Sequence, residues 1–428
     1  MSLVTSAATR DWNSKIIMGL YQSAYKLAKN IGRPLHRRSL RLRHGAFDLG
    51  KGRPRRKGRA LVAYVSDYVR HVTREASHSV WDRDDLDQTL DRLCVGKFAG
   101  HENHRTSADL VRELIERGFV VDCIYNRSGY LIEDVSNYDF ILDEWDNMAR
   151  WAAQNPKARK LFLGTTCHWL CWNRAELQRL DWIFRRRGVS LAPERQLPAM
   201  LGLAAADLVT YYGNDEALHH YGPMRPKLRK VWVCPTAASS AFSTKDWSAA
   251  KKRFLWFGSS SWVHRGLDLV LEAFMQTPDL ELFICGSDQR FLEVYGEGLK
   301  KCKNIHHVGF VTPDSEQFRE LVSKTATVVY ASAAEGCSTS IVQCMRFGLI
   351  PIVTKATGLS VHEFWPALAG QTDLELIADI AKRCTALAEM PDQEVEALSR
   401  RFWEFAATHH SRETFRKSLG GVLDELLK

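Results

Sequence analysis

The feature that most constrains the fold is an alternation of short apolar runs with amphipathic helical patterns, which occurs twice along the chain. The first series opens with "RALVAYV" at 59–65 and continues with a helical pattern in "SADLVRELIERGFVVDCIY", which leads into a strand at 119–125. Strands that alternate with helices pair in parallel and carry helices on both faces of the sheet. The pattern therefore predicts an α/β fold.

The second series has clearer signals and follows a small, polar stretch at 237–252, which we interpret as a linker. "FLWFG" is a predicted strand that ends at Gly258, and "RGLDLVLEAF" is a predicted helix. In "TPDSEQFRELVSK" we expect Thr312 to cap a helix that has Pro313 at its first position. Two doubly wound, Rossmann-like domains of this kind place their ligand in a deep interdomain cleft, at the carboxyl ends of the strands.

These patterns divide the chain into four segments. We expect a basic amphipathic segment at 1–58, an N-terminal Rossmann-like domain at 59–240 and a C-terminal Rossmann-like domain at 241–405. A last helical segment at 406–428 is expected to cross back to the N-terminal domain. The stretch 66–99 does not fit a compact crossover and is interpreted as an insertion.

Composition narrows the class of protein. Hydrophobic residues make up 45% of the 428 residues and charged residues 25%, which are ordinary values for a globular protein. No apolar run reaches the roughly 18 residues of a membrane-spanning helix, and the first residues lack the pattern of a secretory signal. The ten cysteines are scattered without zinc spacing, so we expect reduced thiols and a cytoplasmic protein.

The positive charge of the chain is concentrated near its N-terminus. Residues 1–60 hold 15 Lys and Arg against 2 Asp and Glu, and "RDWNSKIIMGLYQSAYKLAKNIGRPL" has the apolar spacing of an amphipathic helix. This combination favours an anionic membrane surface as a partner of residues 10–59, at the cytoplasmic face. A solvated tail or a helix packed on the body remain alternatives. Nucleic acid is not expected as a partner, because no nucleic-acid fold signature accompanies the charge.

The stretch "EGCSTSIVQCMRFGLIPIVT" carries the chemistry that we expect of the cleft. Glu335 follows the predicted strand "TVVYAS", so it lies at the carboxyl edge of a sheet. Gly336 lets backbone approach a ligand closely. The N–H groups of Cys337, Ser338 and Thr339 open toward the same edge and suit a phosphate. Gln343, in the first turns of the next helix, is expected to reach a ribose.

The residues of the C-terminal half resemble a known family. "GSSSWVHRGLDLVLEAF" followed by the Glu335 stretch is similar to the C-terminal half of glycosyltransferases with the GT-B fold, in particular the retaining group often called family 4. The resemblance implies that Gly258, Arg265 and the Glu335 loop bind a nucleotide-diphosphate sugar. Two positions depart from the family pattern: Ser259 stands where an arginine is common, and Gln343 stands where a second glutamate is common.

The N-terminal half resembles the acceptor domain of the same fold. In "GHENHRTSADLVRELIERGFVV", Gly100 is expected to allow close approach of a ligand and His104 to meet phosphate or acceptor. By the same resemblance, His168 of "TTCHW" faces the transferred sugar and joins Glu335 as a catalytic residue. The alternatives are a surface histidine at 104 and a buried histidine at 168 beside Trp169 and Trp172.

The resemblance implies a retaining, metal-independent transfer of sugar from a nucleotide-diphosphate sugar to a glycan or lipid-linked acceptor, with no cofactor. The leaving diphosphate is stabilised by cations and backbone donors and takes the proton of the acceptor hydroxyl. An acidic run at Asp82 lies in the insertion and is interpreted as a solvated turn, not a metal site. Two alternatives stay open: a catalytically inactive protein of the same fold that binds sugar nucleotides or membranes, and a nucleotide-sugar epimerase, against which the Glu335 loop argues.

Overall fold

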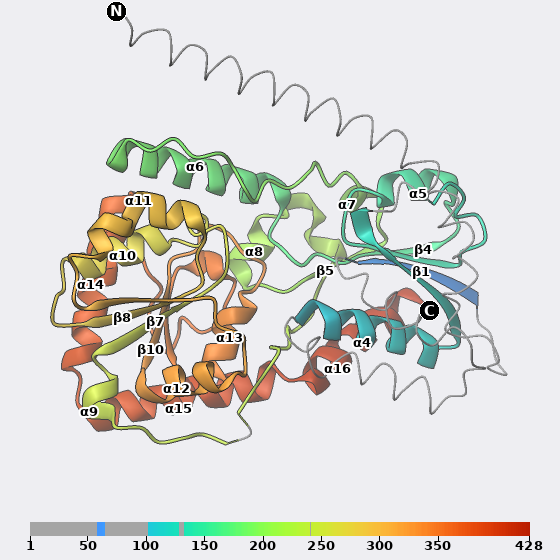
Figure 1. Cartoon of the computed structure of the whole chain (residues 1–428). Helices are drawn as coiled ribbons and strands as arrows, with labels where there is room; N and C mark the ends of the chain where they lie inside the picture. The colour runs from blue at the N-terminus through green and yellow to red at the C-terminus, as the bar shows by residue number, and fades with distance from the viewer. Residues whose placement is uncertain (1–57, 65–101, 128–131, 240) are drawn as a thin grey trace, which may run out of the picture.

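The structure is a computed structural model that describes residues 58–64, 102–127, 132–239 and 241–428. Nearly all of the segment predicted to contact membranes, the insertion at 66–99 and the candidate residue Gly100 lie outside the described residues. The described residues form two parallel sheets, each packed between helices (Figure 1). The predicted α/β class with two doubly wound domains is therefore confirmed.

The first sheet contains six parallel strands in the order β2-β1-β3-β4-β5-β6. All strands run the same way, but the direction in which successive strands are added to the sheet reverses at β1, which pairs with β2 on one side and β3 on the other. A ligand site is expected outside the carboxyl ends of strands at such a switch point. The strands are β1 (Gly58–Tyr64), β2 (Phe119–Tyr125), β3 (Phe140–Asp143), β4 (Arg159–Phe162), β5 (Leu208–Tyr211) and β6 (Leu228–Lys230).

The second sheet contains five parallel strands in the order β11-β10-β7-β8-β9. Here the switch point lies between β7 and β10, which pair with each other. All five strands have buried residues, as expected when helices cover both faces. The strands are β7 (Arg253–Phe257), β8 (Glu281–Cys285), β9 (Ile305–Gly309), β10 (Thr327–Tyr330) and β11 (Ile350–Val353).

Helices connect the strands and cover both sheets. Within the part of the chain that the structure describes, none of them combines the length and apolar character that a membrane span requires. The α-helices are α4 (Glu102–Glu116), α5 (Met148–Gln154), α6 (Trp169–Arg187), α7 (Gly202–Ala205), α8 (Asp215–His219), α9 (Trp247–Ala250), α10 (Leu267–Met275), α11 (Gln289–Leu299), α12 (Glu316–Lys324), α13 (Thr339–Met345), α14 (Asp373–Glu389), α15 (Asp392–His409) and α16 (Arg412–Leu426). Short 3₁₀ turns, η4 (Gly222–Lys227) and η5 (Lys355–Thr357), complete the connections.

The predicted start of α12 is wrong. The helix begins at Glu316, and its N-cap is Ser315, whose Oγ accepts a hydrogen bond from the N–H of Phe318 at 3.2 Å. Thr312 instead closes a turn, since its carbonyl accepts from the N–H of Ser315. Asp314 has φ 66°, a left-handed conformation that a continuous helix does not allow. The helix therefore starts three residues later than its Thr-Pro signal predicts.

Each half of the chain sends one helix onto the other half. In Figure 1, α6 runs over the C-terminal domain beside α10 and α11, and α16 lies beside α4 of the N-terminal domain. Arg186 of α6 pairs with Asp268 of α10 at 2.6 Å, and Arg416 of α16 pairs with Glu113 of α4 at 2.7 Å. The two domains are thus joined by reciprocal helix contacts in addition to the linker.

Candidate active site

A cavity of about 380 Å³ lies between the two sheets. Its lining includes the last residue of β1, Tyr64, and the residue that follows β3, Glu144. From the other sheet come Gly258, which follows β7, and Tyr330, the last residue of β10. Both switch points therefore open into the same space, where the fold places a ligand.

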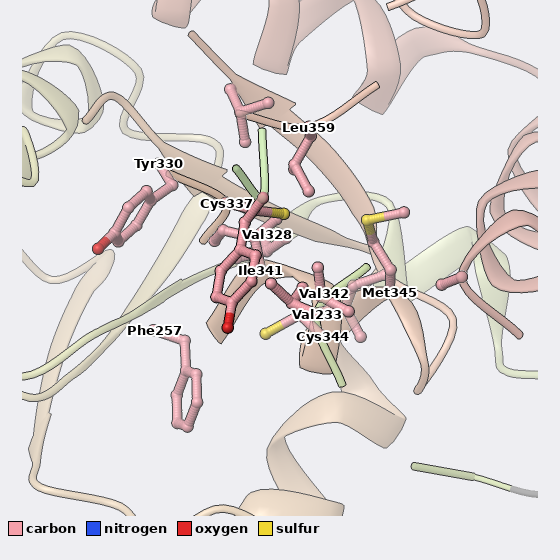
Figure 2. Close-up of a cluster of buried hydrophobic side chains, with 14 of the residues drawn as sticks. Val233, Phe257, Val328, Tyr330, Cys337, Ile341, Val342, Cys344, Met345 and Leu359 are labelled. Atoms are coloured by element: carbon pink, nitrogen blue, oxygen red, sulfur yellow. The ribbon is translucent and has the colours of Figure 1, made fainter. Parts of the chain in front are cut away.

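Buried side chains support the floor of this cavity from the C-terminal domain. Phe257, Tyr330 and Cys337 line the cavity and also belong to the hydrophobic cluster of Figure 2. Beneath them, Val328 and Ile341 are fully buried. The strand ends and the start of α13 are therefore held by packing, so the polar groups above them have fixed positions.

Arg265, the predicted phosphate-binding cation, lines the cavity. Its Nη1 donates to Ser259 Oγ at 2.8 Å, and its Nε is buried without a hydrogen-bond partner among the described residues. Burial lowers the pKa of the guanidinium, but its electrostatic interactions with Tyr330, Glu335 and Glu102 outweigh burial and raise it overall. Arg265 is therefore a charged group with donor capacity left for an anion, and Ser259, the departure from the family pattern, orients it.

Glu335 also lines the cavity, whereas Gly336 does not. One oxygen of the Glu335 carboxylate accepts a hydrogen bond from Ser332 Oγ at 3.2 Å. A Cβ at Gly336 would lie 2.1 Å from the carbonyl oxygen of Thr165. Gly336 thus allows close approach of the N-terminal domain backbone. The sequence-based expectation that this glycine allows close approach of a ligand is corrected.

The backbone donors of this loop are fewer than the sequence suggests. Cys337, Ser338 and Thr339 all line the cavity, but the N–H of Ser338 donates to the carbonyl of Thr357 at 2.9 Å. The prediction that the Ser338 amide is open is therefore wrong. Among the described residues, none accepts a hydrogen bond from the N–H of Cys337 or Thr339. Burial raises the pKa of the Cys337 thiol to about 12, so the thiol is protonated and adds no charge to the cavity wall.

Gln343 lines the cavity from α13 and is 2% exposed. Its Oε1 accepts from the N–H of Ala237 at 3.3 Å, and its Nε2 is buried without a partner among the described residues. A buried amide that lacks a partner is costly unless a ligand supplies one. The geometry leaves Gln343 one donor group for a hydroxyl or carbonyl oxygen.

His168 does not line this cavity, which corrects the expectation that it faces the cleft there. β4 ends at Phe162, and His168 is the N-cap of α6, where its Nδ1 accepts from the N–H of Leu170 at 3.4 Å. It lines a separate cavity of about 70 Å³ behind Thr165 and Thr166. Burial lowers the pKa of His168, and the nearby His220 lowers it further.

His104 is also absent from the lining, although it lies on α4, whose first turns contribute Glu102, Asn103 and Thr106. The acidic groups of this wall were not predicted. Glu102 accepts from Thr339 Oγ1 at 2.9 Å and so joins the two walls. Glu144 accepts from Thr165 Oγ1 at 2.7 Å. Carboxylates at a cavity wall suit the hydroxyl groups of a sugar.

One cation of the site was missed by the sequence analysis. Arg195, from the segment that follows α6, lines the cavity together with Arg265. Its guanidinium lies over the ring of Trp172, 4.8 Å from the centroid. No sequence pattern marks it, because 188–201 carries neither a strand nor a helical period.

Together the residues that line the cavity define a class of protein. It has two doubly wound domains, and its cleft offers arginines and amides on one wall and carboxylates on the other.

Comparisons with known proteins agree with this class. Residues 244–362 match the family model described as glycosyl transferases group 1. The match covers the end of the linker, Gly258, Arg265 and the Glu335 loop, so the resemblance to GT-B glycosyltransferases is confirmed over this stretch. No curated protein matches the sequence of the chain.

Several solved structures are similar to this chain. HepE from Anabaena, determined with UDP-glucose, has 13% sequence identity and a TM-score of 0.51, over 86% of this chain and 98% of its own. The lipopolysaccharide outer core galactosyltransferase WaaB has 10% identity and a TM-score of 0.49, over 73% and 86% of the two chains. The pneumococcal O-GlcNAc transferase GtfA has 13% identity and a TM-score of 0.45; this chain spans 67% of its own length and 57% of GtfA. The architecture of this chain is GT-B.

Proposed function

We propose that this protein is a glycosyltransferase that moves a sugar from a nucleotide-diphosphate sugar to a hydroxyl of a glycan or lipid-linked acceptor. The observation that carries the proposal is the cavity itself: Arg265, Glu335 and Gln343 converge in it, and all three lie within the stretch that matches glycosyl transferases group 1. HepE, which shares the fold over most of both chains, was determined with UDP-glucose, so UDP-glucose is the first donor to test.

The donor side of the proposal rests on charge. Breaking the bond between the sugar C1 and the diphosphate oxygen leaves negative charge on the diphosphate, which Arg265 and the N–H groups of Cys337 and Thr339 are placed to stabilise. Gln343 has a buried donor for the nucleoside or the sugar. Glu335 accepts hydrogen bonds from sugar hydroxyls, which orients the sugar. Because a guanidinium group and backbone amides meet the leaving charge, we propose a transfer that needs no metal ion or cofactor.

The acceptor side of the proposal rests on the opposite wall. Glu102, Glu144 and Tyr64 offer acceptor atoms to the hydroxyls of a glycan. In a retaining transfer the acceptor hydroxyl attacks C1 on the face that the diphosphate leaves, a new C1–O bond forms, and a diphosphate oxygen takes the proton. This route requires no side chain as a base. An anionic membrane surface, reached through residues 10–59, remains part of the proposal for lipid-linked acceptors.

Transfer from labelled nucleotide-sugars tests the proposal. The wild-type protein is incubated with UDP-glucose and other labelled donors, with EDTA, and with glycan or glycolipid extracts as acceptors. We expect a labelled product whose anomeric configuration matches the donor, and a loss of about 100-fold or more for Glu335→Ala. Binding of nucleotide-sugar without transfer to any acceptor, by wild type and Glu335→Ala alike, would instead support the inactive sugar-nucleotide-binding protein.

A further inference from the structure

The cavity contains two arginines from different parts of the chain, and neither has a carboxylate partner among the described residues. Arg265 precedes α10, and Arg195 follows α6, seventy residues earlier. Within the part of the chain that the structure describes, neither guanidinium forms an ion pair with a carboxylate, although Glu335 is close enough to raise the pKa of both. Two like charges in one partly buried cavity repel each other unless an anion lies between or beside them. Glu335 compensates part of this charge without pairing directly with either group, so the arrangement suits an anion that contacts both guanidinium groups.

The backbone around Arg195 is held by two polar side chains of α6. Glu176 is 3% exposed, and its Oε1 accepts from the N–H groups of Glu194 and Arg195, both at 2.8 Å. Asn173 makes two hydrogen bonds of 2.8 Å with the backbone of Leu197. A carboxylate that accepts from two successive amides fixes the chain at that point. Arg195 is thus presented by a fixed segment and not by a free loop end.

The segment is also attached to the C-terminal domain. Glu194 pairs with Arg290 of α11. The rings of Trp172 of α6 and His264 pack against each other in a tilted arrangement, with centroids 4.6 Å apart, and the guanidinium of Arg195 lies 4.8 Å from the Trp172 centroid. His264 directly precedes Arg265 in the chain. The two arginines are therefore positioned by one continuous set of contacts, with Trp172 between Arg195 and the Arg265 loop.

We propose that Arg195 is a second cation for the diphosphate of the donor and that it acts together with Arg265. This inference rests on the proposed function, because it assigns a residue to the same donor site. Burial lowers the pKa of both guanidinium groups and the charge of Glu335 raises it, with a net decrease for Arg195 and a net increase for Arg265. Both groups stay charged at neutral pH, since an arginine pKa remains far above it. The N-terminal half of the sequence thus contributes a side chain to the donor site.

Titration calorimetry separates contact with the diphosphate from a structural role. The full chain, as wild type, Arg195→Ala, Arg195→Lys and Arg174→Ala, is titrated with UDP, ADP and GDP and with the matching nucleosides. Arg174 is the control, because it is an exposed arginine of α6 that does not line the cavity. We expect Arg195→Ala to bind the preferred diphosphate about 10-fold or more weakly, with unchanged affinity for the nucleoside. Arg195→Lys recovers part of the loss, and Arg174→Ala binds as wild type does.

The outcomes distinguish this inference from the proposed function. A wild-type protein that binds none of the three nucleoside diphosphates would overturn both. If Arg195→Ala binds the nucleoside diphosphate as tightly as wild type does, the role of Arg195 is wrong but the proposed function stands. Equal losses for the diphosphate and its nucleoside would also overturn it, since they indicate a distorted cavity and not a missing charge. If Arg195→Ala alters only the KM for a phosphorylated acceptor, the anion is on the acceptor and the inference is wrong.

Discussion

The two helices that cross between the domains are held in different ways. α6 is attached to the C-terminal domain by Arg186, which is 9% exposed and meets three carboxylates. α16 is attached to the N-terminal domain by arginines that are more exposed, 36% for Arg412 and 31% for Arg416, although the carboxylates that they meet are buried. Breaking a buried pair is costly, whereas exposed pairs contribute little. The difference indicates that α6 is structurally part of the donor side, although its sequence lies in the N-terminal half, and that α16 is the weaker connection.

The largest expected effect is on stability, at Arg186. Its guanidinium meets Asp268 at 2.6 Å, Glu272 at 2.9 Å and also Asp373. Arg186→Ala leaves three half-buried or buried carboxylates without their cation, so we expect the free energy of unfolding to fall by about 3–5 kcal/mol. Urea denaturation followed by circular dichroism measures the change. A loss below about 1 kcal/mol, the range of exposed pairs, would remove the contrast between α6 and α16.

The same variant has an expected pH dependence. Burial raises the pKa of the Asp268 carboxyl, and Arg186 opposes that effect. A carboxyl whose pKa is raised in the folded state takes up its proton more readily there, so it favours folding as the pH falls. Without Arg186 this pKa rises further. The stability deficit of Arg186→Ala is therefore expected to be larger at about pH 8 than at about pH 5, and a deficit that does not change with pH would contradict the account.

The second prediction concerns ligand affinity on the donor side. Arg265 offers a buried Nε without a partner among the described residues, and its Nη1 is oriented by Ser259. Arg265→Ala is expected to weaken binding of a nucleoside diphosphate by roughly 1.5–3 kcal/mol, and Arg412→Ala to leave this affinity unchanged, because α16 is not part of the donor side. Calorimetry with UDP measures both variants. Unchanged affinity in Arg265→Ala would exclude Arg265 from the site.

Much of the donor wall could be predicted because local patterns decide it. The apolar run at 253–257 forms β7, and the strand–loop–helix signal around Glu335 places that residue at the carboxyl edge of β10. Parallel sheets bring such edges together, so the sequence alone is enough to assign Arg265 and Glu335 to one cavity. At these positions, residues close in sequence determine where each side chain lies.

Other parts of the site depend on residues distant in sequence. The N–H of Ser338 is taken by the carbonyl of Thr357, and nothing in the local sequence shows that pairing. His168 was expected to face the transferred sugar, but β4 ends at Phe162 and the chain continues before α6 begins, so its side chain enters another cavity. Arg195 reaches the donor side only because α6 packs on the other domain. These contacts are set by tertiary packing, which single-sequence patterns do not encode.

A third and smaller effect is expected at the other crossing helix. Arg412 contacts the buried carboxylate of Asp109 at 2.9 Å, and Asp109 also has Arg112 at 3.4 Å. Because Arg112 remains when Arg412 is removed, the carboxylate is not left alone. Arg412→Ala is therefore expected to lower the free energy of unfolding by about 1 kcal/mol. A loss as large as that of Arg186→Ala, in the same urea experiment, would show that both helices are held equally.

The smallest expected effect is at Arg185, which serves as the control for its neighbour Arg186. Arg185 pairs with Asp181 on the outer face of α6, where the two side chains are 75% and 49% exposed. One residue along a helix turns the side chain by about 100°, so Arg185 points away from the C-terminal domain while Arg186 points into it. Arg185→Ala is expected to change the free energy of unfolding by less than about 0.5 kcal/mol. If it destabilises as strongly as Arg186→Ala, the effect of Arg186 reflects helix content or net charge, and the argument that buried ion pairs fix α6 to the donor side fails.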